Sequence, residues 1–254
     1  MHSNNNTLSY LSYNKTLFFK NAYELKLRLL YCLLSLSITI IACYIYSDAI
    51  IYFFVNPILI KMSSQRFIFT SLKEIFFMYL KFSCISGLFF TLPIFFTQFI
   101  LFFLNGLYKY EVKLILYISL FSFCLFCLGF CLGYKVIIPN AWNFFLSFEN
   151  QNAFFPLHFE AKLNNYLFFI INVLLGIILC FQIPSIIFLL VSFNFILNIE
   201  FFKKRKLIYI INVILGTLIS SPDIFSQLFI ICSLIFIYEI LIFFLFFIKE
   251  LKKD

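Results

Sequence analysis

Charged residues and histidines are scarce in this chain, and each shortage excludes a class of protein. Only 12% of its 254 residues are charged and 63% are hydrophobic, a composition far from that of a soluble domain. The two histidines, His2 and His158, lie outside the apolar stretches, so no span offers a histidine to a haem iron. A soluble globular protein and a membrane subunit with histidine-ligated haem are therefore excluded.

Two further absences concern targeting to a compartment. Residues 1–20 have neither the apolar core nor the small-residue cleavage site of a secretory signal. They also lack arginine, which mitochondrial import peptides use. We therefore expect a polar N-terminal tail over residues 1–20 and one membrane domain over residues 21–254, in a chain made inside the compartment where it works.

Long apolar runs are what the sequence has in place of charge. A membrane-spanning helix needs roughly 20 apolar residues, and six runs predict an all-α integral membrane protein with six transmembrane helices. The predicted spans are residues 29–46, 75–104, 113–138, 166–197, 207–219 and 224–248. The fifth run would be roughly 20 Å long against a hydrocarbon core of about 30 Å. We expect short fifth and sixth helices, the fifth sheltered by protein or by thinned lipid.

The basic residues indicate how the spans are oriented. The net charge is +8, but lysine and arginine occur in short connections between the apolar runs. This is the positive-inside distribution, and it argues against a nucleic-acid partner. Because the connections on the side of the termini are the more basic, we expect both termini on the cytoplasmic or matrix side.

The eight cysteines all lie in apolar runs, which argues against a disulfide framework. Cys124, Cys127 and Cys131 share one helix face, a spacing that is open to a metal or redox site. Small apolar packing residues are the simpler interpretation of this pattern. We therefore expect neither a metal nor a cofactor.

The turn between the fifth and sixth runs carries the most informative polar residues. Ser221 suits the N-cap of the following helix, Pro222 its first position and Asp223 its first turn. Gln227 lies on the same face as Asp223. Glu239 lies three turns deeper, where an ionisable group faces protein, water or a partner because lipid is costly for it. Two alternatives stay open: a hydrated cap for the first residues, and lipid headgroups for Glu239.

Carboxylates also stand at the start of the first and third spans. Glu24 and Arg28 are four residues apart, which allows an ion pair along a helix, although a basic anchor at the membrane surface explains this segment equally well. Glu111 opens the third span, where the helix dipole favours negative charge.

These residues, taken together, resemble the TatC family, a subunit of the twin-arginine protein translocase. The resemblance covers residues 21–248, with the family's motifs in order and at matching spacings. They are Glu24-Leu-Lys-Leu-Arg28, then Glu74 to Lys81 with Pro93 and Gln98, then Phe102 to Glu111, Pro139-Asn-Ala-Trp142, and Ser221-Pro-Asp-Ile-Phe-Ser-Gln227 with Tyr238-Glu239. Three residues depart from the usual pattern: Lys26 for arginine, Asn105 for proline and Gln182 for the glutamate of bacterial members.

The resemblance implies a receptor rather than an enzyme. Such a subunit binds the twin-arginine signal peptides of folded proteins and transports these proteins with the proton gradient. The implied partners are small single-span TatA/TatB-type subunits, further copies of the chain and membrane lipid. Gln182, the Pro-Asn-x-Trp stretch and an AT-rich composition (41 Phe, one Trp) favour the mitochondrial inner membrane, with the thylakoid or a bacterial inner membrane as alternatives.

The resemblance also implies two groups of site residues. The signal-peptide group is Glu24, Lys26, Arg28, Phe102 and Glu111, and the partner-docking group is Gln182, Asp223, Gln227 and Glu239. Two rivals stay open. A respiratory-complex subunit would need haem or metal ligands or buried ionisable groups. A small-solute transporter would need polar groups near the midplane of several spans, whereas most here lie near span ends, and the sequence shows no internal repeat.

Overall fold

The chain is almost entirely helical. The computed structural model describes residues 2–59, 67–69, 71–102, 109–148, 162–192, 205–219 and 223–251. The helices are α1 (His2–Ile45), α2 (Ser47–Leu59), α3 (Leu72–Phe102), α4 (Lys109–Leu132), the π-helix η2 (Gly133–Ile137), α5 (Ile138–Leu146), α6 (Leu163–Ser192), α8 (Arg205–Ile219) and α9 (Ile224–Leu251). Among these residues the extended backbone is limited to one isolated bridge between Ile68 and Lys162.

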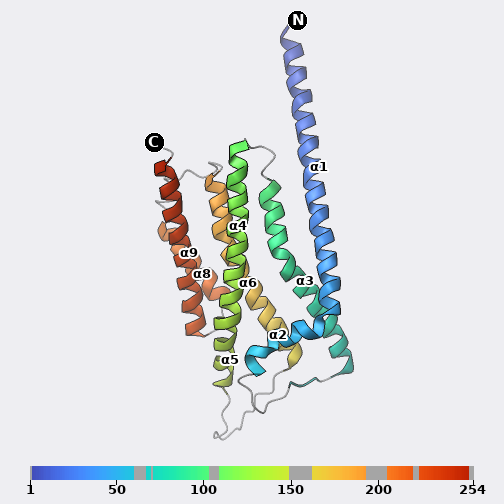
Figure 1. Cartoon of the computed structure of the whole chain (residues 1–254), viewed down its shortest axis with the longest axis vertical. Helices are drawn as coiled ribbons and strands as arrows, with labels where there is room; N and C mark the ends of the chain where they lie inside the picture. Colours follow the sequence, from blue (N-terminus) through green and yellow to red (C-terminus); the bar gives the residue numbers. More distant parts are fainter. Residues whose placement is uncertain are drawn as a thin grey trace.

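The helices form one bundle around α6 (Figure 1). Five stretches are long and apolar enough to cross a membrane: Phe19–Ile45, Lys73–Phe102, Ile115–Leu146, Leu163–Ser192 and Ile224–Phe243. The fourth, in α6, is the most buried, with 61% of its most apolar part inside the protein. The shorter α8 stands beside α9 as the sixth helix. The predicted class, an all-α multi-pass membrane protein with six helices, is confirmed.

The first and last helices are longer than expected. α1 begins at His2, so the segment predicted as a polar tail is a helix continuous with the first span. α9 has 28 residues, which corrects the expectation of a short sixth helix, whereas α8 has 15 and is short as expected. No proline or glycine lies in residues 2–28 or 249–251, so nothing in the sequence breaks these two helices where their predicted spans end.

The third span is one rod made of three helical segments. η2 lies between α4 and α5, and the N–H of Ile138 donates to the carbonyl of Gly133, five residues back. Pro139 follows directly and has no N–H for the carbonyl four residues before it, so the regular α-helical ladder cannot continue there. At Gly133 a Cβ atom would lie 2.4 Å from Cδ2 of Leu174, and the missing side chain therefore lets the rod approach α6.

Helix α2, inside the predicted 47–74 connection, lies across the lower end of the bundle (Figure 1). Its Pro57 has no N–H, which deprives the carbonyl of Phe53 of its helical partner. The hydroxyl of Tyr134 donates to this carbonyl over 2.7 Å, and the hydroxyl of Tyr166 donates to that of Phe54 over 3.3 Å. Two tyrosines thus fasten α2 to η2 and α6.

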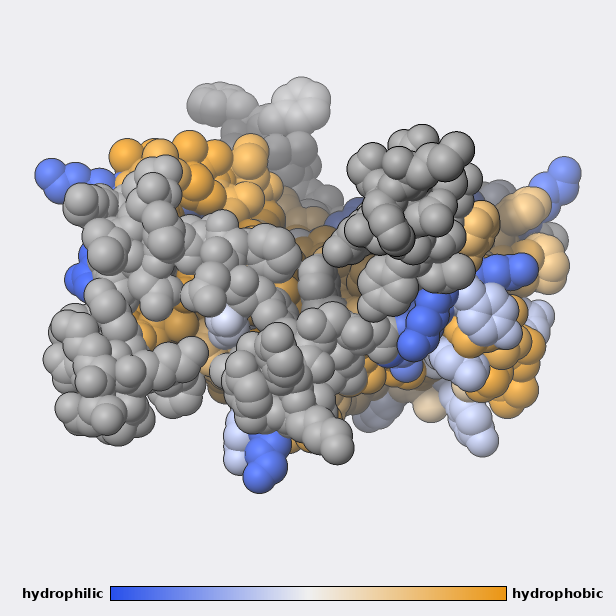
Figure 2. Space-filling view, turned by 90° about the horizontal axis from the view of Figure 1, so that it is seen from above, coloured by the Kyte–Doolittle hydropathy of each residue, from blue (hydrophilic) through white to orange (hydrophobic). Residues whose placement is uncertain are grey.

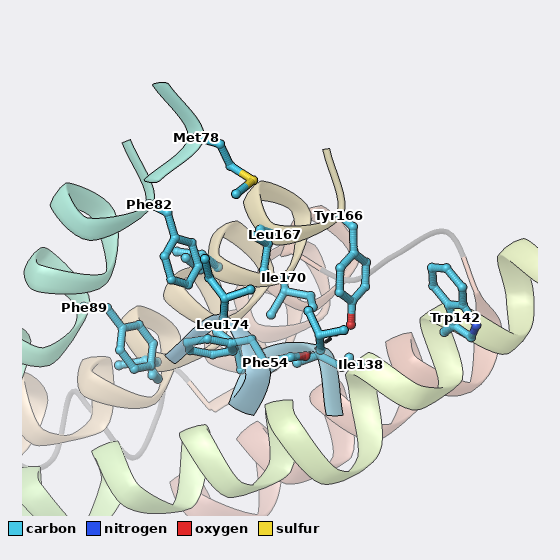
Figure 3. Packing of buried hydrophobic residues seen from close by; sticks show 14 residues of the cluster. Phe54, Met78, Phe82, Phe89, Ile138, Trp142, Tyr166, Leu167, Ile170 and Leu174 are labelled. Carbon is cyan, nitrogen blue, oxygen red and sulfur yellow. Dashed lines mark hydrogen bonds between the residues drawn. The ribbon is translucent and has the colours of Figure 1, made fainter. Parts of the chain in front are cut away.

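A core of large side chains lies between α2 and the rest of the bundle. Figure 3 shows Phe54 of α2 beside aliphatic side chains of α6 and phenylalanines of α3. Phe54 and Phe82 meet edge to face with ring centroids 6.0 Å apart. Trp142, the last residue of the Pro-Asn-Ala-Trp motif, meets Tyr166 in the same way at 5.4 Å. This motif therefore holds the end of the third span against the start of the fourth.

Both termini lie at the same end of the bundle (Figure 1). The end of α3 and the start of α4 lie there too, while α2 and α5 lie at the opposite end. Figure 2 looks down on the end that carries the termini and shows hydrophilic side chains around its edge among apolar ones. The predicted common side of the termini is thereby confirmed.

Candidate functional site

The first polar group of interest depends on close packing between α1 and α3. At Gly87 of α3 a Cβ atom would lie 2.6 Å from Cγ1 of Ile40, so only glycine permits this approach of the two helices. The hydroxyl of Thr39 donates to the carbonyl of Gly87 over 3.3 Å. The crossing leaves the middle of α1, around Arg28, beside the C-terminal end of α3.

Arg28 of α1 reaches Gln98 of α3 at that end. Its Nη1 donates to Oε1 of Gln98 over 3.4 Å, and both residues are half-buried. Glu24 is also half-buried, and its Oε2 has no hydrogen-bond partner within the described residues. The Nε of Arg28 is likewise unpaired there. The sequence allowed a Glu24–Arg28 ion pair; the structure instead directs the guanidinium to Gln98.

An unpaired carboxylate oxygen that is shielded from water is costly, because it has lost solvation without gaining a donor. Glu24 therefore offers an acceptor to a cationic ligand at this end of the protein. Exposed Lys26 lies on the same helix, and half-buried Phe102 ends α3. Glu111 belongs to the first turns of α4 at this end, but its side chain lies outside the described ones.

Gln182 of the second predicted group is not available to a partner. Its side chain is 0% exposed. Its Oε1 accepts from the hydroxyl of Ser122 over 2.6 Å, and its Nε2 donates to the carbonyl of Ser122 over 3.0 Å. Ser185 adds a third contact to Oε1 at 3.3 Å. The amide therefore joins α4 to α6, and we correct its assignment from docking to internal structure.

Asp223 is the N-cap of α9, a role that the sequence suggested for Ser221. The helix begins at Ile224, and Oδ2 of Asp223 accepts from the N–H of Ser226 over 2.8 Å, the usual geometry of an aspartate cap. Ser221 and Pro222 lie outside the described residues. Asp223 is only 6% exposed, so the cap is buried rather than hydrated.

Glu239 faces protein, the first of the options that the sequence left open. Its Oε1 accepts a hydrogen bond from the hydroxyl of Tyr209 on α8. Nearby, a Cβ atom at Gly216 would lie 2.5 Å from Cγ1 of Ile231, so α8 and α9 are in close contact. The Tyr209–Glu239 bond therefore ties the short helix to the long one.

Of the predicted docking group, half-buried Gln227 makes no side-chain hydrogen bond within the described residues.

Sequence reasoning missed Asn212, the buried polar residue of α8. It is 1% exposed, and both its amide oxygen and its amide nitrogen lack a partner among the described residues. It follows Tyr209 by three residues and precedes Gly216 by four, so it belongs to the side of α8 that meets α9. An asparagine in a 13-residue apolar run was the signal that could have revealed it.

The three clustered cysteines lie on the outside of α4. Cys124, Cys127 and Cys131 are exposed, whereas Cys43 and Cys180 are buried. The packing interpretation therefore holds for the latter two and not for the cluster. Among the residues that the structure describes, no three histidine, cysteine or acidic side chains are placed to hold a metal ion.

Known proteins resemble this chain in both sequence and fold. The family model for the Sec-independent protein translocase protein (TatC) matches residues 22–233. An uncharacterized tatC-like protein of Reclinomonas americana is 34% identical over 223 residues, which make up 87% of this chain and 84% of that protein. The Sec-independent protein translocase protein TatC of Rickettsia prowazekii is 34% identical over 225 residues, or 87% and 89% of the two chains.

A solved structure agrees with the arrangement of the helices. The crystal structure of the twin-arginine translocase receptor TatC in DDM matches with a TM-score of 0.72 and covers 88% of this chain and 98% of that one. At 24% sequence identity this likeness concerns the fold. With the family match over residues 22–233, it leads to one conclusion. The chain belongs to the TatC family of Sec-independent protein translocase proteins, which are translocase components and not enzymes.

Proposed function

We propose that this chain is a receptor subunit that binds twin-arginine signal peptides at the shared end of α1, α3 and α4. The observation that carries this proposal is the unpaired, water-shielded Oε2 of Glu24 beside the Arg28–Gln98 hydrogen bond. A guanidinium group is the strongest partner for such a carboxylate, because it donates two parallel hydrogen bonds. The rigid α1–α3 crossing holds the carboxylate in place before the peptide arrives.

The remaining residues of this group have distinct roles in the proposal. Glu111 supplies the carboxylate for the second arginine of the peptide. Phe102 packs beside the bound peptide, and Arg28, held toward α3 by its bond to Gln98, leaves Oε2 of Glu24 to the peptide. Lys26 keeps a positive charge but lacks the guanidinium fork, so we assign it to the rim of the site.

Transport in this proposal uses the proton gradient and requires small single-span TatA/TatB-type subunits and further copies of the chain. Half-buried Gln227 supports a docking surface along α8 and α9, because an amide in lipid favours an interhelical hydrogen bond. The short α8 supports it too, since a helix of this length thins the bilayer or is sheltered by a partner. The composition supports a mitochondrial inner membrane.

Photo-crosslinking of a twin-arginine peptide to the purified protein in nanodiscs tests the proposal. The peptide should label the wild type, and replacement of both its arginines by lysines should reduce labelling at least tenfold. Glu24→Gln keeps the side-chain shape and removes the charge, so it should reduce labelling by a similar factor, since hydrogen bonds to a charged group are worth about 1.5–3 kcal/mol.

Glu74→Gln is the matched control, because Glu74 is another half-buried glutamate but begins α3 at the opposite end of the bundle. It should label like the wild type. Equal labelling by both peptides, or a Glu24→Gln variant that labels normally, would reject this site.

A further inference from the structure

A groove runs along the outer surface of the bundle between α4 and α9, in the half nearest the termini. It has a volume of about 340 Å³ and is lined by Tyr117, Leu120, Phe121, Cys124, Phe188, Ile240 and Leu241. Its floor is protein: Phe188 and Leu241 are buried, and Phe121 meets Phe188 edge to face at 6.1 Å. Its walls, including Tyr117 and Leu120, are exposed toward lipid. The groove is therefore a defined hollow in the membrane-facing surface.

Among the described residues, the charged side chain nearest the groove along α4 is Lys113, one helical turn before Tyr117. Lys113 is exposed and lies on the same face of α4 as Tyr117, Leu120 and Cys124, because these positions follow helical spacing. The Lys113 ammonium has no acidic partner within the described residues, and neither does the Tyr117 hydroxyl have a hydrogen-bond partner there. Both are donors next to a hollow whose described lining is almost entirely apolar.

The groove lining on α4 covers about 10 Å, from Tyr117 to Cys124, and the distance from Lys113 to the far end of the groove matches one leaflet of a bilayer. Lys113 and Cys124 are separated by about 16 Å of helix at 1.5 Å per residue, and half of the hydrocarbon core is about 15 Å. A lysine at the start of a span extends its ammonium toward the headgroup region. The groove is thus an apolar channel within one leaflet, with a positive charge above it at headgroup level.

We propose that this groove binds one acyl chain of an anionic phospholipid whose phosphate accepts hydrogen bonds from Lys113 and Tyr117. The charge at the mouth selects an anion over a zwitterion. The lining favours an acyl chain over a transmembrane helix, because helix contacts in membranes use small residues, whereas most side chains here are large. The lipid fills the space that α6 leaves between the two helices.

Native mass spectrometry of the full-length protein tests this proposal with palmitoyl-oleoyl phosphatidylglycerol and phosphatidylcholine as probes. The wild type should retain the anionic lipid about fivefold more than the zwitterionic one, the ratio expected for one lysine near the headgroups. Lys113→Gln should remove this preference. Lys135→Gln is its matched control, because Lys135 is exposed on the same rod near its other end.

A second pair of variants tests the channel itself. Cys124→Phe should fill the groove and lower the retention of both lipids severalfold. Cys131→Phe makes the same change on the same face of α4, two turns deeper and outside the groove lining, and should leave retention unchanged. Equal retention of the two lipids by the wild type would overturn the proposal. A photoreactive residue in place of Leu120 gives a second test in native membranes. The proposal would be overturned if this residue crosslinked to a single-span protein and not to photoreactive phosphatidylglycerol.

Discussion

At the scale of single residues, most intramembrane polar groups are paired within the chain. Gln182 binds Ser122, and Glu239 accepts from Tyr209. The sequence reveals that these polar side chains exist but not which groups they meet. Which group each polar side chain meets depends on how its helix is rotated about its axis. An almost uniformly apolar sequence does not indicate that rotation. Hence the sequence alone could not distinguish a docking role for Gln182 from an internal hydrogen bond.

Tyr134 gives the sharpest stability prediction at this scale. Replacing it with phenylalanine removes the donor to the carbonyl of Phe53, which Pro57 already leaves without a helical partner. We expect Tyr134→Phe to destabilise the protein by about 0.5–1.5 kcal/mol, the net contribution of one hydrogen bond at an exposed site. Thermal unfolding in detergent, followed by tryptophan fluorescence, measures the change.

The control for that variant comes from α2 itself. Tyr52 is exposed and makes no hydrogen bond to the described residues, so Tyr52→Phe should leave the unfolding temperature close to that of the wild type. A Tyr134→Phe variant as stable as Tyr52→Phe would show that the hydroxyl does not support α2.

At the scale of helices, the apolar runs predicted every span, but the point at which a helix ends depends on where proline or glycine interrupts it. α1 and α9 continue beyond their predicted limits because no proline or glycine stops them. α2 escaped prediction because its 13 residues lie in a connection and its stability comes from Tyr134, Tyr166 and the core beneath it. Contacts between distant segments decide such an element, and local sequence does not contain them.

The crossing of α1 and α3 can be tested through Gly87. Gly87→Leu would place atoms within the space of Ile40, so we expect α1 to move away from α3 at a cost of about 1–3 kcal/mol. Pulsed electron resonance between spin labels at Leu33 and Phe95, in a cysteine-free chain, should then report a longer and broader distance distribution.

Loss of this crossing should also weaken peptide labelling at Glu24, because Arg28 would lose its contact with Gln98. Ala42→Leu serves as the reference, since Ala42 of α1 is exposed and offers room for the larger side chain. An unchanged distance in Gly87→Leu would mean that the helices do not depend on this glycine for their approach.

At the scale of the whole molecule, the common end of the termini predicts the behaviour of tagged protein. Epitope tags at the N-terminus and at the C-terminus should both be digested by protease from the same side of sealed vesicles. A tag inserted in the 60–66 connection, which precedes α3, should be digested only from the opposite side. Protection of one terminal tag while the other is cleaved would contradict the arrangement of the six helices.

The unbroken course of α1 has a mechanical consequence. A helix of 44 residues is a rod about 66 Å long, and a single residue, Tyr46, joins its far end to α2. Because α3 holds α1 at Ile40 and at Arg28, the movable part is the roughly 39 Å of helix that precede Arg28, and a tilt of about 5° there would carry the tip roughly 3 Å sideways. A load applied to this projecting end would therefore act first on the Arg28–Gln98 contact with α3, at the end of the bundle that carries the termini.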